Sequence, residues 1–180
     1  FIAASTINQY NKYGNLLSKE CKVNEEIKYL KSALVDLTNG KNDYSNIENF
    51  CKSIEIPFTV VKSDAFEVVF EIRKEKNPCS LCANLRRGII NSVAIREGCN
   101  KIALGHNEDD VLETFFLNLL YGGSINTFAP KSYMDRSEIT LIRPLIYAPE
   151  KSIKTFIKKN NIEVMPKCCP MDGVSKREDI

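Results

Sequence analysis

The stretch KIALGHNEDDVLETFFLN, residues 101–118, changes its hydrophobic period at a glycine. KIAL is a short apolar run of the kind that forms a buried parallel strand. Beyond the glycine, apolar side chains recur at helical spacing and form one wide face, namely Val111, Leu112, Phe115, Phe116, Leu119 and Leu120. The acidic residues between the two patterns are typical of a helix N-terminus. The stretch therefore predicts a strand that leads directly into a helix.

The same alternation recurs along the rest of the chain. We expect further strands at residues 1–5, 32–38, 58–61 and 139–145, and further helices at residues 44–53, 64–76, 85–98 and 149–160. Alternating strands and helices predict an α/β fold in which a parallel sheet carries helices on both faces. A length of 180 residues suits a single domain, residues 1–180. Because the chain begins inside an apolar stretch, we expect its natural N-terminus to lie before Phe1.

Composition excludes some classes of function. The formal net charge is +2, so the chain as a whole is not strongly basic, although local basic clusters can still bind nucleic acid. No apolar run approaches the roughly 18 residues of a membrane span, so we expect no membrane partner. Seven cysteines, an odd number, indicate the reducing cytoplasm, where clustered thiols more often serve metal binding or catalysis than structural disulfides.

The residues that follow the KIAL strand are candidates for a binding site. In an open α/β sheet, ligands bind beyond the carboxyl ends of the strands. Gly105 allows a ligand to approach the backbone, and His106 is the only histidine of the chain. Asp109 and Asp110 have the oxygen ligands that magnesium prefers. The alternative is that these carboxylates only favour the N-terminus of the helix.

Basic residues form two further candidates. Arg86 and Arg87 are expected to open the helix after Cys82, where guanidinium groups can bind phosphate in bidentate fashion. Lys151, Lys154 and Lys158 recur at helical spacing in the last helix. Such lysines either form a solvated face or follow an RNA backbone. For Arg86 and Arg87, the alternative to phosphate binding is a solvated helix face, where two arginines are commonplace.

The cysteines allow several interpretations. Cys79 and Cys82 form a C-x-x-C motif, which by itself is compatible with a metal site, a redox pair or chance. The tail adds Cys168 and Cys169; three thiolates suit an iron–sulfur cluster with one open iron, and four suit structural zinc. Adjacent cysteines rarely both reach one metal, which favours three ligands. The remaining cysteines, Cys21, Cys51 and Cys99, are expected to be small packing residues.

Five stretches together resemble one known family. They resemble the tRNA 2-thiolation enzymes of the PP-loop ATP pyrophosphatase superfamily, most closely the tRNA 2-thiocytidine synthetase group. The stretches are PCSLCANLRRG, KIALGHNEDDVLETFFLN, YGG, LIRPLIY and CCPMDG followed by SKRE. The resemblance runs from about residue 33 to the C-terminus. It implies the PP-loop fold and an enzyme that uses ATP and Mg²⁺ to adenylate a pyrimidine in the tRNA anticodon loop before sulfur replaces AMP.

The resemblance also implies a set of site residues. Cys79, Cys82 and Cys169 correspond to the ligands of a [4Fe–4S] cluster, with Cys168 as the neighbouring alternative. The nucleotide and catalytic pocket corresponds to Arg86, Asp109 and Asp110 as catalytic residues and to Ser5, Asp36, Gly105 and His106 as nucleotide-binding residues. The implied partners are tRNA and a sulfur donor such as a cysteine desulfurase, and the family allows a homodimer.

One motif of the family is missing from the chain. The loop SGGKDS should follow the first strand, but FIAA runs directly into Ser5 and Thr6. No glycine, lysine or aspartate stands where backbone N–H groups cradle pyrophosphate. This absence defines the alternative function, a non-catalytic tRNA- or metal-binding relative that has lost ATP turnover. A zinc-stabilised α/β domain without a nucleotide is the third alternative.

Overall fold

The computed structural model describes residues 2–6, 30–37, 40, 42–74, 78–165 and 169, with only the backbone of residues 2–6. The described residues form one six-stranded sheet with the strand order β3-β2-β1-β4-β6-β5. The strands are β1 (Ile2–Thr6), β2 (Leu30–Asp36), β3 (Phe58–Lys62), β4 (Lys101–Ala103), β5 (Lys131–Met134) and β6 (Ile139–Ile142). Every strand expected from the sequence is present, and β5 is additional.

Four of the described strands run in the same direction. β2 pairs with β3 and β4 pairs with β6 in parallel, whereas β1 is antiparallel to both β2 and β4. β5 is antiparallel to β6, as a hairpin with a four-residue turn requires. The expected parallel sheet is thus confirmed for β2, β3, β4 and β6. The direction of β1 differs, and hydrophobic periodicity contains no information about strand direction.

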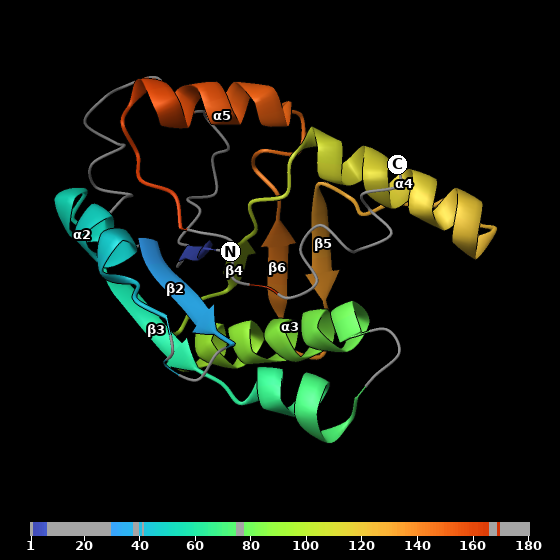
Figure 1. Ribbon diagram of the computed structural model, residues 1–180, viewed down its shortest axis with the longest axis horizontal. Coiled ribbons are helices and arrows are strands. Elements are labelled where there is room, and N and C mark those ends of the chain that lie inside the picture. Colours follow the sequence, from blue (N-terminus) through green and yellow to red (C-terminus); the bar gives the residue numbers. More distant parts are fainter. Residues whose placement is uncertain are drawn as a thin grey trace.

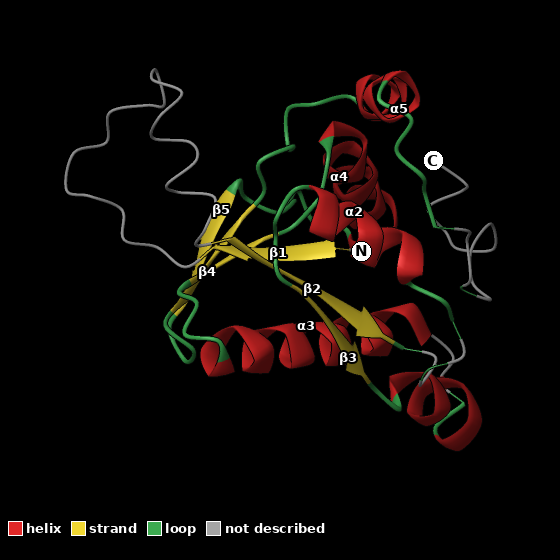
Figure 2. Ribbon diagram, turned by 90° about the vertical axis from the view of Figure 1, so that its left-hand side faces the viewer, coloured by secondary structure: helices red, strands yellow, loops and turns green. Residues whose placement is uncertain are grey.

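Helices cover both faces of the sheet, as expected. They are α2 (Ser45–Ser53), the π-helical turn η1 (Glu67–Ile72), α3 (Pro78–Arg96), α4 (Glu108–Gly122) and α5 (Glu150–Lys159). Figure 2 shows α3 and η1 on one face, with α2, α4 and α5 on the other. α4 extends outward at one end of the molecule (Figure 1). Among the described residues, no helix is both long and apolar enough to cross a membrane.

Two clusters of buried side chains hold the layers together. The first packs the end of α3 against β4 and β6, through Ala94, Cys99, Ile102, Ile139 and Leu141. The second packs α2 against β2, through Leu34, Ile47 and Cys51. Cys51 and Cys99 are only 3% and 5% exposed, which confirms that both are packing residues. Cys21 lies outside the described residues.

Two helices differ from the expectation. α3 begins at Pro78 and therefore contains both cysteines of the C-x-x-C motif, whereas the helix was expected to start after them. Proline is favoured at the first position of a helix, where its missing N–H has no partner to lose. In α4 the predicted apolar face is present, but none of its residues is buried. Leu112, Phe116, Leu119 and Leu120 are all exposed.

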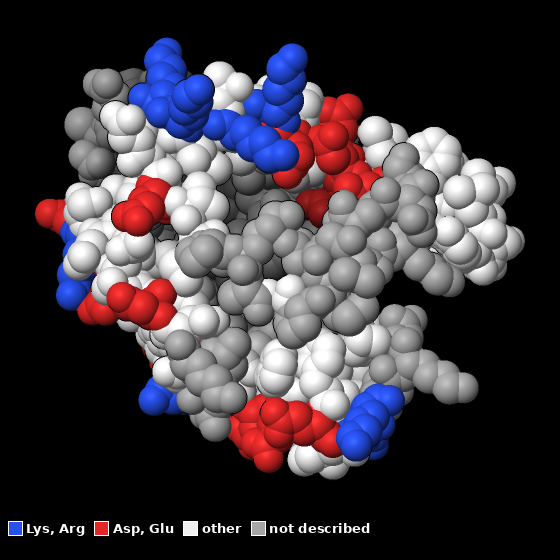
Figure 3. All heavy atoms as spheres, in the orientation of Figure 1, with Lys and Arg blue, Asp and Glu red and all other residues white. Residues whose placement is uncertain are grey.

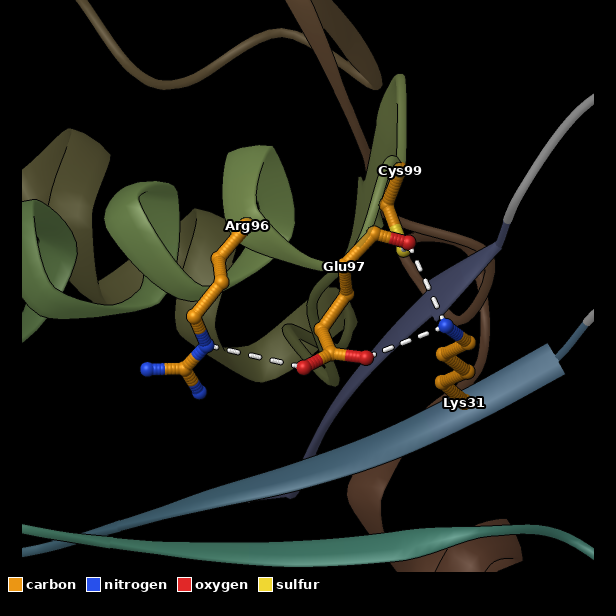
Figure 4. A network of polar contacts seen from close by, with 4 residues as sticks. All are labelled: Lys31, Arg96, Glu97 and Cys99. Carbon is orange, nitrogen blue, oxygen red and sulfur yellow. Dashed lines mark hydrogen bonds and ion pairs between the residues drawn. The ribbon is translucent and has the colours of Figure 1, made fainter.

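A network of hydrogen bonds and ion pairs joins β2 to the end of α3 (Figure 4). Lys31 Nζ donates to the Glu97 carboxylate at 3.0 Å and to the Glu97 carbonyl oxygen at 3.2 Å. Arg96 Nε lies 3.5 Å from the other carboxylate oxygen of Glu97. The hydrogen bond from Lys31 and its charge are the main causes that hold the pKa of Glu97 below its ordinary value. This network attaches α3, the helix that contains Cys79 and Cys82, to strand β2 of the sheet.

Candidate functional site

One face of α3 carries two thiols and a guanidinium group. Cys79, Cys82 and Arg86 are spaced three and four residues apart within α3, and side chains at these spacings are neighbours on a helix surface. Arg86 therefore lies in the third turn of the helix, one turn beyond Cys82, and does not open the helix as expected. Arg87 points elsewhere, since its Nη2 donates to the Asn84 side-chain oxygen at 2.7 Å.

The tail contributes a third thiol to this face. Burial raises the pKa of the Cys82 thiol above its ordinary value, the charge of Arg86 lowers it, and the thiols of Cys169 and Cys79 raise it. These interactions require all four groups to lie near one another. Cys79, Cys82 and Cys169 are free thiols, and Cys79 and Cys169 are exposed. Cys168 lies outside the described residues.

The donor set suits a thiolate-bound group, although the side chains are not arranged around a metal ion. Within the described part of the chain, no three His, Cys, Asp or Glu side chains stand close enough together to hold one. Three soft sulfur ligands match iron–sulfur clusters better than magnesium or calcium. The chemistry of the three thiols therefore fits such a cluster, although their placement does not form its binding site.

The motif after β4 forms the start of α4. Asn107 is the N-cap, and its side-chain oxygen accepts from the Asp110 N–H at 3.0 Å. The Asp110 carboxylate in turn accepts from the Asn107 N–H at 3.0 Å, which completes a capping box. The helix-capping interpretation of Asp110 is therefore confirmed. A Cβ atom at Gly105 would meet nothing within 4 Å, so the backbone there is open to a ligand.

Asp109 serves a different helix. Its Oδ2 accepts from the backbone N–H of Glu150 at 2.6 Å, at the first residue of α5. The other oxygen has no partner among the described residues and lies beside a groove of about 400 Å³. The groove is lined by Asp109, Glu150, Lys151, Lys154, Thr155 and Lys158. Magnesium is usually bound through one or two carboxylates together with substrate phosphates, so the free oxygen of Asp109 remains available to it.

Asp36 stands at the end of β2, where a nucleotide ligand was expected. The residue is 1% exposed, and its carboxylate accepts from the Gly40 N–H and from the Tyr44 hydroxyl, the latter at 2.7 Å. Its backbone oxygen accepts from the Ser63 N–H at 2.9 Å. These contacts show that Asp36 organises the turn between β2 and α2. A role in nucleotide binding stays a prediction.

Sequence reasoning missed an aromatic and cationic stack beyond β4 and β6. The ring of His106 lies 4.8 Å from that of Phe128, and the Arg143 guanidinium lies 4.8 Å from the same ring. Arg143 Nη1 donates to the Ala129 carbonyl at 2.6 Å, and burial lowers the pKa of Arg143. His106 and Arg143 follow adjacent parallel strands. The signal in the sequence was LIRPL, where an arginine directly follows an apolar strand.

The predicted site residues therefore fall into two groups. Cys79, Cys82 and Arg86 lie on α3 with Cys169 of the tail near Cys82, whereas Asp109 contacts the start of α5, which lies on the other side of the sheet (Figure 2). That both groups face one cleft stays a prediction. The side chain of Ser5 lies outside the described residues.

Polar groups beyond the ends of β2, β4 and β6 define an α/β protein of the class that binds ligands at its strand ends. The chain belongs to the PP-loop family, because the family model described as the PP-loop domain matches residues 17–166. This result confirms the resemblance and the fold deduced from the sequence.

Curated relatives with similar sequences are tRNA-cytidine(32) 2-sulfurtransferases. The chain is 41% identical to that of Nitrosospira multiformis over 131 residues, which are 72% of this chain and 43% of the relative. It is 38% identical to that of Citrifermentans bemidjiense over 144 residues, which are 78% of this chain and 56% of the relative. The chain thus spans about half the length of the curated relatives it matches.

A solved structure has the same fold. The U34-tRNA thiolase NcsA from Methanococcus maripaludis, determined with its [4Fe–4S] cluster, superposes with a TM-score of 0.65 and 23% sequence identity. The superposition covers 87% of this chain and 56% of that chain. The shared architecture extends over most of the sheet and its helices.

Proposed function

We propose that the chain is the PP-loop part of an ATP-dependent tRNA thiolation enzyme. The relatives with about 40% identity are tRNA 2-sulfurtransferases, and the solved neighbour is a tRNA thiolase that contains a [4Fe–4S] cluster. The observation that carries the proposal is that Cys79, Cys82 and Arg86 lie at neighbouring positions on α3, with Cys169 near enough to Cys82 to affect the pKa of its thiol. A structural zinc site normally has four ligands, whereas these three thiols leave one position open.

The chain's own residues have distinct tasks in this reaction. Cys79, Cys82 and Cys169 would hold the [4Fe–4S] cluster, which would supply the chemistry of sulfur transfer. Arg86 places a positive charge beside Cys82, where it opposes the effect of burial, which raises the pKa of that thiol, and it can attract the phosphates of the substrate. The bare backbone at Gly105 admits the nucleotide, and the free oxygen of Asp109 is available to Mg²⁺.

The reaction class is adenylation followed by substitution. The carbonyl oxygen of an anticodon-loop pyrimidine attacks the α-phosphorus of ATP, and the bond to pyrophosphate breaks. A sulfur nucleophile then adds to the activated carbon, and AMP leaves with the former carbonyl oxygen. Cytidine is the favoured base because the two relatives described above, at 41% and 38% identity, are tRNA-cytidine(32) 2-sulfurtransferases.

The partners follow from this function. We expect tRNA as the substrate, a sulfur donor such as a cysteine desulfurase, and a homodimer in the cytoplasm. The thiols support this location, since the five cysteines in the described part of the chain are all free, as a reducing compartment requires.

The test is anaerobic purification followed by iron and product analysis. Protein prepared without oxygen should contain about four irons per chain. A form of the protein that also carries the SGGKDS loop after its first strand should release pyrophosphate when tRNA and ATP–magnesium are present, and mass spectrometry of digested tRNA should then detect a thiolated cytidine. Stoichiometric zinc without iron would contradict the proposal. Iron and tRNA binding without pyrophosphate release in the loop-containing form would instead identify the non-catalytic alternative.

A further inference from the structure

We propose that one face of α5 is a docking surface for the phosphate backbone of RNA. This lysine face consists of Lys151, Lys154 and Lys158. The proposal rests on the proposed tRNA substrate and names the part of the chain that holds the RNA strand. Nothing in the thiolation chemistry itself requires these lysines.

The three lysines form a continuous basic strip. They are spaced three and four residues apart in α5, so their side chains project from the same side of the helix. Seven residues of helix correspond to about 10 Å, which is long enough to meet more than one phosphate of a nucleic-acid strand. Figure 3 shows Lys and Arg side chains grouped over α5 at one edge of the molecule.

These charges are available to a ligand. Within the described residues, Lys154 forms an ion pair with Glu150 at 2.7 Å, and neither Lys151 nor Lys158 has a described ion pair. Both partners of the Glu150 pair are substantially exposed, and exposed pairs at this spacing contribute only about 0.3–0.5 kcal/mol. A phosphate can therefore replace the Glu150 carboxylate at little cost.

The surface is also shaped and fixed in position. The groove of about 400 Å³ lies along the lysine face and has Asp109 at its edge. Two hydrogen bonds tie the helices beside it, from Glu150 N to Asp109 Oδ2 at 2.6 Å and from Glu108 N to the Ala148 carbonyl at 3.1 Å. The lysines are thereby held at a set position relative to the motif that follows β4.

Acidic residues beside the lysine face limit where the RNA strand can lie. Glu150 and Asp109 repel phosphates, whereas the three lysines, which line the same groove, attract them. Acidic side chains stand beside the basic group in Figure 3. The strand should therefore lie along Lys151, Lys154 and Lys158 and leave the two carboxylates free for magnesium.

The experiment measures binding of a tRNA transcript to full-length protein by filter retention at several salt concentrations. The test variant is Lys151→Gln/Lys154→Gln/Lys158→Gln. The control variant, Lys52→Gln/Lys74→Gln/Lys131→Gln, removes the same charge at exposed lysines outside α5. Each phosphate contact contributes about 0.7–0.9 to the slope of log K against log salt. The test variant should lose about 2–3 from this slope and bind at least about tenfold more weakly at low salt.

The outcomes separate this surface from the proposed function. Replacement of the same three lysines by arginine should retain binding, because the charge persists. Equal weakening of the test and control variants, or a test variant that binds like the wild type, overturns the docking surface. Binding to anionic phospholipid vesicles through the three lysines, without binding to tRNA, also overturns it. If the protein binds tRNA through the lysine face but its loop-containing form produces no thiolated nucleoside, the surface stands and the proposed function fails.

Discussion

The Asp109 carboxylate accepts a hydrogen bond from the backbone N–H of Glu150, with 2.6 Å between Oδ2 and N. A side chain in the first turn of α4 thus caps a helix 41 residues further along the chain. The N-terminal N–H groups of a helix have no partners within the helix, and a side-chain oxygen that accepts from one of them stabilises it. Asp109 therefore has a structural task in addition to any role in catalysis.

Substitutions at Asp109 should separate these two roles. Asp109→Ala removes the cap of α5 and should lower the free energy of unfolding by about 1 kcal/mol. Asp109→Asn keeps an oxygen that can accept from Glu150 N, so its stability should stay within about 0.5 kcal/mol of the wild type. Urea unfolding followed by circular dichroism measures both values.

The same pair tests the magnesium role. If Asp109 also binds Mg²⁺, Asp109→Asn should retain stability and bind Mg²⁺ more weakly in calorimetry, because an amide is a weaker ligand than a carboxylate. An asparagine variant that binds Mg²⁺ as tightly as the wild type would show that Asp109 only caps α5.

The contact between Tyr44 and Asp36 makes a second prediction. The Tyr44 hydroxyl donates to the buried Asp36 carboxylate at 2.7 Å, so Tyr44→Phe leaves that oxygen without this donor. Loss of a partner by a buried polar group costs about 1–3 kcal/mol. Tyr147→Phe is the matched control, because Tyr147 is 81% exposed and such surface changes usually stay within about 0.5 kcal/mol. Equal stability of the two variants would show that the contact contributes nothing.

The ion pair between Lys31 and Glu97 should appear in the pH dependence of stability. The hydrogen bond from Lys31 lowers the pKa of Glu97 from its ordinary value of 4.5. A lowered pKa means that the stabilisation is present above about pH 4.5 and is lost as the pH falls through the lower pKa of the folded state. Lys31→Met should therefore be less stable than the wild type at pH 7, and the difference should shrink under acid conditions.

Melting temperatures of the two proteins between pH 3 and pH 7 provide the comparison. Glu97→Gln is a suitable control because it removes the titrating carboxyl group. Its melting temperature should therefore change less with pH than that of the wild type. A stability difference that is the same at pH 3 and pH 7 would contradict the assignment of this pH dependence to the pair.

Local patterns in the sequence were sufficient for much of the fold. The period change at Gly105 predicted β4 and α4. The position of Cys99 just before the KIAL strand and the helical spacing of Cys51 with apolar neighbours favoured buried packing residues. The start of α3 was wrong because the C-x-x-C motif was interpreted as a loop, although Pro78 is itself a helix-start signal. Strand β5 was missed because KSYM is short, polar and at the sheet edge.

Contacts distant in the sequence were not accessible in this way. Nothing in a hydrophobic pattern pairs Asp109 with Glu150, or places Phe128 between His106 and Arg143. For the same reason, Cys79 and Cys82 were grouped by the C-x-x-C motif, whereas Cys169 was chosen as the third ligand only through the resemblance to known enzymes.

The choice of the third thiol makes a fourth prediction. Cys169 acts on the pKa of Cys82, so we expect Cys169 to be the third cluster ligand and Cys168 to be dispensable. Cys169→Ser should lower the iron content after anaerobic reconstitution well below four per chain, whereas Cys168→Ser should keep it. Cys99→Ala serves as the control for loss of any thiol, because Cys99 is buried in the core. Retained iron in Cys169→Ser together with lost iron in Cys168→Ser would reverse the assignment.

The last prediction concerns the binding of ATP. The chain lacks the SGGKDS loop after its first strand, and with it the backbone N–H groups and the lysine that hold pyrophosphate. Hydrogen bonds to charged groups contribute about 1.5–3 kcal/mol each. At about 1.4 kcal/mol per tenfold, the loss of two such bonds weakens binding about a hundredfold.

A chain of this sequence should therefore bind ATP–magnesium weakly and release no pyrophosphate, even when tRNA is present. AMP is the matched control ligand, because it lacks the pyrophosphate that the loop would cradle. If only the adenosine side of the pocket near Asp36 and Gly105 remains, AMP and ATP should bind with similar affinity in calorimetry. Much tighter binding of ATP than of AMP, by protein whose measured mass matches 180 residues, would show that another part of the chain holds the pyrophosphate. The same result with a heavier chain would show that the loop is present in that protein, and the thiolation chemistry would then have its full set of phosphate contacts.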